Sequence, residues 1–271
     1  RNESSAASDV YKRQTLFDTY SHLIIKYKET NMKNNKPHFL LIHGAWHGGW
    51  VWNEISEILS YQGYSVSTPT LTGLGEKKHL LSSKITIDTF IEDVVNHIIF
   101  ENLNNIILVG HSFAGSVISG VADKLKDRIQ NLIYFDALII KEGQKPFDIA
   151  PKELVKQRIE LAKRFGNGIS IPAPSADAFG VFDVKKSLLL EEKLTPHPLS
   201  TYQSKLTIKN EIGNGIPLFY IFCNDPVYKS LESSRKVVRK LKWPIFELNA
   251  GHDAMLTHPK ETLNLLMKIC N

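Results

Sequence analysis

The sequence predicts an α/β fold in which a mainly parallel sheet carries helices on both faces. Short apolar runs rich in β-branched residues alternate with segments whose apolar residues recur at helical spacing. One such run, 106–109, passes through a glycine-containing turn straight into a helical segment. The alternation fails only between 141 and 206, where six prolines are scattered, and this stretch is predicted to be an inserted helical cap.

The expected strands share apolar character and end at glycine, proline or polar residues. They are 38–43, 64–68, 106–109, 129–135, 217–223 and 245–248. The expected helices have apolar residues on one face. They lie around 55–59, 87–98, 117–125, 227–241 and 259–270, with shorter ones at 153–165 and 185–192 in the cap. In such a sheet, ligands bind beyond the carboxyl ends of the strands.

The length of 271 residues suits one domain with a cap. The first residues are polar and lack periodicity, and the run SSAASDVYKRQ resembles a translated cloning adapter. Residues 1–31 are therefore expected to be a non-native or disordered extension. The α/β domain is expected to span 32–271, with the cap at about 141–206.

The composition argues against several classes of function. The net charge of +5 is mild. Most of the densest basic group falls on the helix expected at 227–241, where it is interpreted as a solvated face rather than a nucleic-acid site; its members are Arg235, Lys236, Arg239, Lys240 and Lys242. Two cysteines indicate neither a disulfide framework nor a metal site. With no apolar run of about 20 residues and no signal-peptide pattern, a cytoplasmic protein is expected. No cofactor and no membrane or nucleic-acid partner is expected, and the sequence leaves open a homodimer.

Ser112 is the predicted nucleophile. It lies in Gly110-His111-Ser112-Phe113-Ala114, between the strand at 106–109 and the following helix. This strand–turn–helix context distinguishes a nucleophile elbow, G-x-S-x-G with alanine at the last position, from a chance match. A serine hydroxyl must be activated by a base, and the turn lifts it above the sheet toward one.

His252 is the predicted base because it follows the last strand and so reaches the same edge of the sheet. Histidine is the side chain suited to accept and return a proton near neutrality. A carboxylate should orient the imidazole. Asp225, after the strand at 217–223, gives the chain order Ser, Asp, His and is favoured. Asp136, at the end of the strand at 129–135, is the competing choice.

An oxyanion hole needs two backbone N–H groups aimed at the developing negative charge. Phe113, directly after the nucleophile, is expected to supply one of them. Ala45, in the glycine-rich loop after the first strand, is expected to supply the other, with Gly44 allowing a close approach.

The stretches HFLLIHGAWHGGWVW, TPTLTGLGE, ILVGHSFAG, YFDALI and AGHDAMLTHP together resemble the α/β-hydrolase superfamily. Within it, they are similar to small serine esterases related to plant methylesterases and hydroxynitrile lyases, and to their bacterial esterase relatives. The resemblance implies Ser112 as nucleophile, His252 as base, and Ala45 and Phe113 as oxyanion donors. The lyase branch carries threonine at the position of Gly44, which favours ester hydrolysis here.

The expected activity is hydrolysis of carboxylic esters of small to medium hydrophobic acids through an acyl-enzyme. Several aromatic and apolar residues of the cap and loops are candidates for the pocket, namely Trp46, Phe113, Phe147, Phe165, Phe179, Phe182 and Met255. Three alternatives on the same fold stay open: hydrolysis of a lactone or amide, a hydroxynitrile-lyase-like reaction, and a non-catalytic small-molecule receptor.

Overall fold

The computed structural model describes residues 36–270, so the expectation for residues 1–31 lies outside the described residues. Six strands form one sheet in the order β2-β1-β3-β4-β7-β8, and every neighbouring pair is parallel. The strands are β1 (His38–Ile42), β2 (Ser65–Ser67), β3 (Ile106–His111), β4 (Ile129–Phe135), β7 (Leu218–Cys223) and β8 (Ile245–Leu248). The predicted α/β class and parallel sheet are confirmed.

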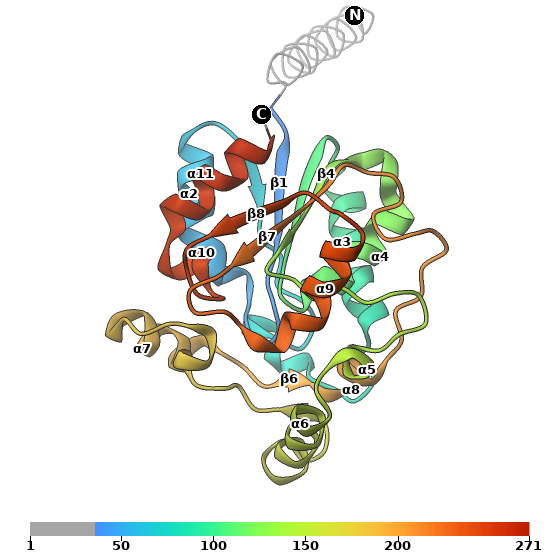
Figure 1. Cartoon of the computed structure of the whole chain (residues 1–271), viewed down its shortest axis with the longest axis vertical. Coiled ribbons are helices and arrows are strands. Elements are labelled where there is room, and N and C mark those ends of the chain that lie inside the picture. Colours follow the sequence, from blue (N-terminus) through green and yellow to red (C-terminus); the bar gives the residue numbers. More distant parts are fainter. Residues whose placement is uncertain (1–35, 271) are drawn as a thin grey trace, which may run out of the picture. The chain divides into compact units, whose positions relative to one another are not determined.

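Helices cover both faces of the sheet (Figure 1). On one face lie α2 (Asn53–Tyr61) and α11 (Pro259–Cys270), and on the other α3 (Ile87–Phe100), α4 (Ala114–Leu125) and α9 (Glu232–Lys240). The short α10 (Ala254–Thr257) precedes α11. This is the three-layer arrangement that strand–helix alternation predicts.

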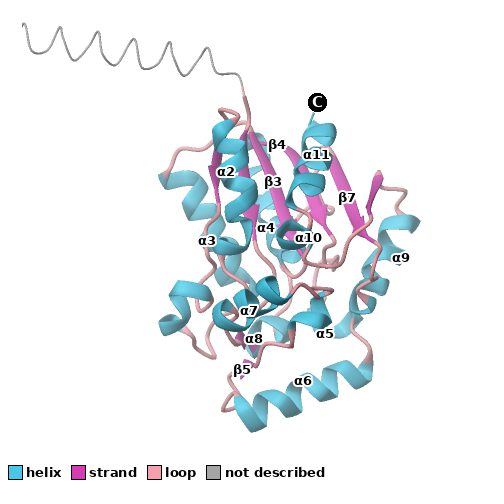
Figure 2. Ribbon diagram, turned by 90° about the vertical axis from the view of Figure 1, so that its left-hand side faces the viewer, coloured by secondary structure: helices cyan, strands magenta, loops and turns pink. Residues whose placement is uncertain are grey.

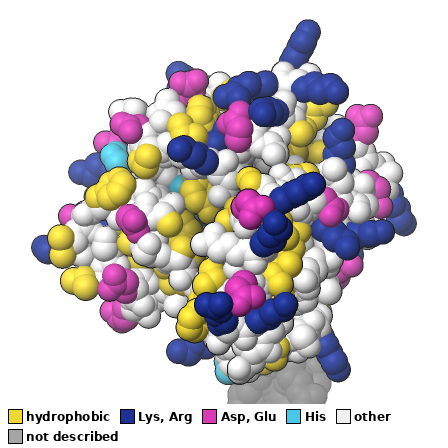
Figure 3. Space-filling model, turned by 60° about the horizontal axis from the view of Figure 1, so that its bottom comes forward, with side chains coloured by type: hydrophobic (Ala, Val, Ile, Leu, Met, Phe, Trp, Pro, Cys, Tyr) yellow, Lys and Arg dark blue, Asp and Glu magenta, His cyan; other side chains and the backbone are white. Residues whose placement is uncertain are grey.

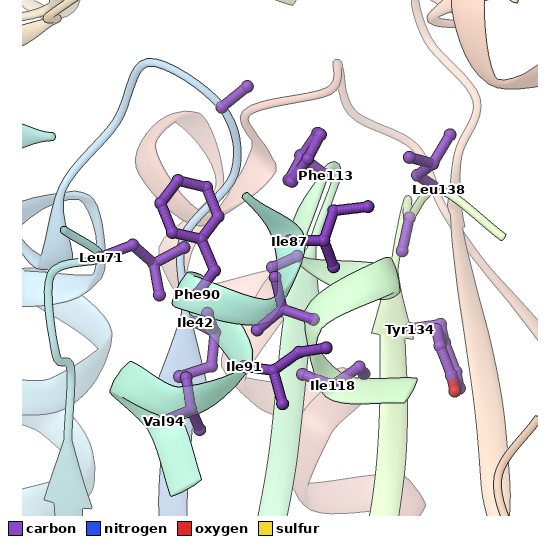
Figure 4. Packing of buried hydrophobic residues seen from close by; sticks show 14 of the residues in the cluster. Ile42, Leu71, Ile87, Phe90, Ile91, Val94, Phe113, Ile118, Tyr134 and Leu138 are labelled. Atoms are coloured by element: carbon purple, nitrogen blue, oxygen red, sulfur yellow. The ribbon is translucent and has the colours of Figure 1, made fainter. Parts of the chain in front are cut away.

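Side-chain alternation along the strands divides the core into two layers. In β1, Leu40 and Ile42 pack with the α3 and α4 layer, whereas Phe39 and Leu41 pack with the α2 and α11 layer. Figure 4 shows the first layer, in which Phe90 and its neighbours on α3 meet residues of β1 and α4. A strand apolar on both faces is therefore a continuous hydrophobic run, which is why the strands were recognisable in the sequence.

Between β4 and β7 the chain leaves the sheet and forms the cap, defined here as residues 141–206. It contains α5 (Pro146–Ile149), α6 (Lys152–Phe165), α7 (Val184–Lys193) and α8 (Leu199–Gln203). A two-stranded antiparallel pair, β5 (Ser170–Ile171) with β6 (His197–Pro198), ties two of its segments together. Figure 2 shows these elements gathered beyond one end of the sheet.

One helix is shorter than predicted. The segment expected to be helical from 227 begins its α-helix at Glu232, because the chain first makes a turn and a single 3-10 turn at Lys229–Leu231. Across residues 36–270, no helix is both long enough and apolar enough to cross a membrane.

Candidate active site

Ser112 directly follows the last residue of β3, and Asp136 directly follows the last residue of β4. The two strands are neighbours in register, with His111 opposite Phe135. Both residues have a positive φ, 54° at Ser112 and 38° at Asp136. Such backbone is sparsely populated by non-glycine residues and collects at functional sites. The register thus brings the serine and the carboxylate to the same point of the sheet edge.

His252 joins these two side chains. Its Nε2 lies 2.9 Å from Ser112 Oγ, and its Nδ1 lies 2.7 Å from Asp136 Oδ2. Both bonds are satisfied together when Nδ1–H donates to the carboxylate and Nε2 accepts from the serine hydroxyl. His252 and Asp136 are almost wholly buried, whereas Ser112 is half-buried and reachable from the pocket.

The prediction that Asp225 orients His252 was wrong. The carboxylate that His252 contacts is that of Asp136, the competing choice. Asp225 is exposed, in a tight turn that begins as soon as β7 ends at Cys223. Its backbone N–H donates to the Ala250 carbonyl, which holds this turn against the end of β8. The turn is too short to bring the carboxylate back over the sheet edge.

Arg235 on α9 was also misread as part of a solvated basic face. It is 2% exposed, and its Nη2 lies 3.0 Å from Asp136 Oδ1, while Nη1 donates to the Tyr228 carbonyl. A signal for its burial existed in the sequence. Arg235 lies at helical spacing from the apolar Leu231 and Val238, which are both buried.

The two predicted oxyanion donors lie on either side of Ser112. Phe113 follows it at the start of α4, and Ala45 belongs to the loop after β1. Within residues 36–270 neither the Ala45 nor the Phe113 backbone N–H has an acceptor. Gly44 allows the loop to approach, since a Cβ added there would lie 2.8 Å from Ser112 Cβ. Buried N–H groups without partners suit a site that binds a transient negative charge.

Buried histidines hold this loop in place. His43 Nδ1 bonds the Gly44 carbonyl at 2.8 Å, and its Nε2 accepts from the Leu71 N–H at 3.0 Å. Burial lowers the pKa of His43 to about 3, so the ring is neutral. His47 bonds the Ala45 carbonyl at 2.7 Å and Asp253 at 3.0 Å. Burial lowers the pKa of His47, but the charge of Asp253 and these bonds outweigh it and raise the pKa overall.

Trp46 connects the same loop to the cap. Its backbone N–H lies 3.4 Å from His197 Nδ1, and its indole N–H donates to the Ile171 carbonyl at 3.1 Å. The Trp46 carbonyl accepts from the Thr195 N–H at 2.9 Å. With φ at 67°, Trp46 is a third positive-φ residue at this edge. The cap and the loop after β1 are thus joined by hydrogen bonds.

His111, His252 and Asp253 have nitrogen and carboxylate atoms close enough together to bind a metal ion. Both ring nitrogens of His252, however, are engaged by Ser112 and Asp136. His111 Nε2 donates to the His252 carbonyl at 3.1 Å, and burial lowers the pKa of His111 well below its usual range. This arrangement fits a hydrogen-bonded support for His252 better than a set of free ligands.

A hollow of about 420 Å³, open solvent at its mouth included, lies between Ser112 and the cap. Its lining is mainly apolar, with Trp46, Phe113, Leu138, Ile149, Leu154 and Leu231 among the residues involved. Of the other predicted pocket residues, Phe165 and Phe182 are mostly exposed, and Met255 is in the core on the α2 and α11 side. Phe147 stacks on Tyr202 of the lining, and Phe179 packs against His47.

The family model for the alpha/beta hydrolase family matches residues 39–265. The chain belongs to the alpha/beta hydrolase family. This match spans the sheet, the cap and all the residues that surround Ser112, so the predicted family is confirmed.

Several proteins resemble this hydrolase over most of their length. A carbendazim hydrolyzing esterase from Nocardioides sp. (strain SG-4G) is 32% identical over 235 residues, which cover 82% of this chain and 95% of that protein. Methylesterase 17 from Arabidopsis thaliana is 24% identical over 262 residues, which cover 89% and 94%. An extracellular alpha/beta-hydrolase from a Paenibacillus species, said to share structural and functional homology with tobacco salicylic acid binding protein 2, matches with a TM-score of 0.76. It is 26% identical, and the match covers 86% of this chain and 98% of that one.

Proposed function

We propose that this hydrolase cleaves carboxylic esters with Ser112 as nucleophile, His252 as base and Asp136 as the orienting acid. The observation that carries the proposal is the continuous pair of hydrogen bonds from Ser112 through His252 to Asp136, beside two unpartnered N–H groups. Serine hydrolysis requires this set of roles, and geometry identifies them regardless of chain order.

The first half-reaction forms an acyl-enzyme. Ser112 Oγ attacks the ester carbonyl while His252 Nε2 takes its proton, and Asp136 stabilises the resulting imidazolium. The carbonyl oxygen becomes an oxyanion that accepts hydrogen bonds from Ala45 and Phe113, near the positive end of α4. The carbonyl then re-forms, and the alcohol leaves with the proton that His252 returns.

Water completes the cycle. His252 takes a proton from a water molecule, which attacks the acyl-enzyme, and the same two N–H groups hold the second oxyanion. Ser112 then regains its proton from His252, and the acid is released. Because the hollow above Ser112 is mainly apolar, the reacting group is expected to be a small to medium hydrophobic acyl or alcohol moiety.

Two observations favour ester hydrolysis over the lyase alternative. The resembling proteins with named activities include a carbendazim hydrolyzing esterase and methylesterases. Position 44, where the lyase branch carries threonine, has no room for a side chain, because a Cβ would lie 2.8 Å from Ser112 Cβ and 2.9 Å from His111 Nδ1.

The test is hydrolysis of p-nitrophenyl and methyl esters of graded acyl size by the wild type and by Ser112→Ala. We expect turnover by the wild type and a loss of several orders of magnitude in kcat for the variant. Unfolding curves should coincide, since the substitution removes one half-buried hydroxyl. Full activity of Ser112→Ala, or no hydrolysis of any ester by the wild type, would contradict the proposal.

A further inference from the structure

Arg158 is a charged residue in an otherwise uncharged pocket. It lies on α6 of the cap and lines the same hollow as Ser112. Its guanidinium carbon is 5.3 Å from the Trp46 ring centre and 4.7 Å from that of Tyr202. Stacking on aromatic rings is favourable for a guanidinium and uses its flat faces, while its N–H groups lie in its own plane, where the Tyr202 hydroxyl is one hydrogen-bonding neighbour.

In the part of the chain that the structure describes, no carboxylate neutralises this guanidinium. Among residues 36–270, no acidic oxygen lies within 4.0 Å of it, although α6 carries two glutamates. Glu153 pairs with Lys156, and Glu160 pairs with Arg164, both along the outer side of the helix. Arg158 is therefore the cation of α6 that faces the hollow without an ionic partner.

The surroundings add to this positive potential. The α6 sequence KELVKQRIELAKRF contains five basic and two acidic residues. Figure 3 shows the face that carries the cap, where lysine and arginine side chains, with aspartate and glutamate side chains among them, stand around hydrophobic patches. A cleft with walls of low dielectric and one sign of charge concentrates ligands of the opposite charge.

We propose that Arg158 binds a carboxylate at the end of the substrate remote from the scissile bond. The substrate class is then esters that carry a free acid, such as half-esters of dicarboxylic acids, with the methylene chain on the apolar lining. This inference rests on the proposed ester hydrolysis at Ser112. A guanidinium recognises a carboxylate through two parallel N–H···O bonds, which gives both affinity and orientation.

The experiment compares two methyl esters of the same length. Monomethyl adipate ends in a carboxylate and methyl hexanoate ends in a methyl group; half-esters of succinate and suberate extend the series. The kcat/KM ratio of the charged to the neutral ester is measured for the wild type, Arg158→Met, Arg158→Lys and Arg164→Met. Methionine retains an apolar stem against Trp46 and Tyr202, and Arg164 is a mostly exposed arginine of the same helix.

We expect Arg158→Met to lower this ratio roughly ten- to a hundredfold, the usual range for a hydrogen bond to a charged group. Arg158→Lys should be intermediate, because it retains the charge but not the planar fork. Arg164→Met should match the wild type. The change should appear in KM rather than kcat, since a remote carboxylate is bound equally in the ground and transition states.

A ratio that stays the same in Arg158→Met would overturn the proposal, even if both esters react more slowly, since the arginine would then only pack the cap. A binding measurement separates this outcome from failure of the proposed activity. Calorimetry with monomethyl adipate is done on Ser112→Ala and on Ser112→Ala/Arg158→Met. Binding that depends on Arg158 supports the carboxylate site even without turnover, and binding that does not, or no binding, contradicts it.

Discussion

Arg235 Nη2 and Asp136 Oδ1 form a buried ion pair at 3.0 Å, on the opposite side of the carboxylate from His252. The same guanidinium donates to the carbonyl of Tyr228, whose ring stacks on His252 at 4.0 Å between centres. One side chain therefore fixes two of the groups that surround the imidazole. A buried charge of this kind is tolerated only where it is paired and hydrogen-bonded.

Replacing Arg235 by methionine should destabilise the fold strongly, because it leaves the Asp136 charge buried without its cation. We expect a loss of about 3–5 kcal/mol in the free energy of unfolding. Arg239→Met is the matched control: it lies on the same helix and over the same Phe222 ring but is about half exposed. Its cost should stay below about 1 kcal/mol. Urea unfolding of both variants measures the difference, and equal losses would contradict this role for Arg235.

Asp136→Asn should abolish most activity, whereas Asp225→Asn should leave it unchanged. An amide at 136 no longer favours the His252 tautomer that accepts from Ser112, and the comparable change in another serine hydrolase costs about 10⁴ in kcat. Asp225 is exposed and does not contact His252. Ester hydrolysis is measured at a temperature at which circular dichroism shows both variants folded. If Asp225→Asn lost more activity than Asp136→Asn, Asp225 would be the acid, in the chain order Ser, Asp, His expected from the sequence.

Gly44→Ala should reduce activity at least tenfold with a smaller effect on binding. The added Cβ must move either Ser112 or the loop that carries Ala45, because the contacts at 2.8 and 2.9 Å are too short. A shift of this size misplaces an oxyanion donor, and losing one donor costs about 10²–10³ in kcat. Gly143→Ala is a control with open space around it, although its φ is positive. If kcat of Gly44→Ala equalled that of the control, close approach at 44 would not matter for the reaction.

Stability should fall as the pH drops below about 6.5, in part because of His43. Its folded pKa of about 3 lies below that of an unfolded histidine, so the unfolded chain takes up a proton that the folded protein does not. The contribution is complete above pH 6.5 and is lost toward pH 3, at up to about 1.4 kcal/mol per pH unit.

Urea unfolding at pH 7.5, 6 and 5 tests this for the wild type, His43→Gln and the exposed control His79→Gln. His43→Gln is expected to be less stable at pH 7.5, because the bonds to Gly44 and Leu71 are disturbed. Its disadvantage should shrink as the pH falls, because glutamine does not titrate. A disadvantage that is the same at all three pH values would be evidence against the assignment.

The central strands β1, β3 and β4 were predictable because their residues are mostly apolar and buried on both faces. The edge strands β2 and β8 are partly exposed and were indicated by their place in the strand–helix alternation. Ser112 and His252 were predictable for a related reason: the elbow motif and the position after the last strand fix them relative to the sheet edge. The acid was not. Choosing between Asp136 and Asp225 depends on the length of the turn after β7 and on the ion pair between Asp136 and Arg235. The hydrophobic pattern can indicate that Arg235 is buried, but it gives neither the length of that turn nor the carboxylate with which the arginine pairs.

The burial of Arg235 was also difficult to predict from the sequence. A basic residue in a basic helix is usually solvated, and only its spacing from Leu231 and Val238 indicated otherwise. The pocket residues were also only partly predictable. Trp46 and Phe113 belong to segments anchored at the sheet edge. Phe165 ends α6 and Phe182 precedes α7 in the cap, and the sequence does not indicate how these cap segments are oriented relative to the sheet.

Because Asp136 directly follows β4, the proposed nucleophile, acid and oxyanion donors all precede the cap in the chain, and only the proposed base His252 follows it. Insertions or deletions within 141–206 therefore leave the spacing among the earlier four untouched. Such changes would alter the shape of the hollow above Ser112 while the reacting groups keep their positions at the sheet edge. This requires that Trp46 retains its bonds to Ile171, Thr195 and His197. New substrate preferences can thus arise in this chain by altering one contiguous segment.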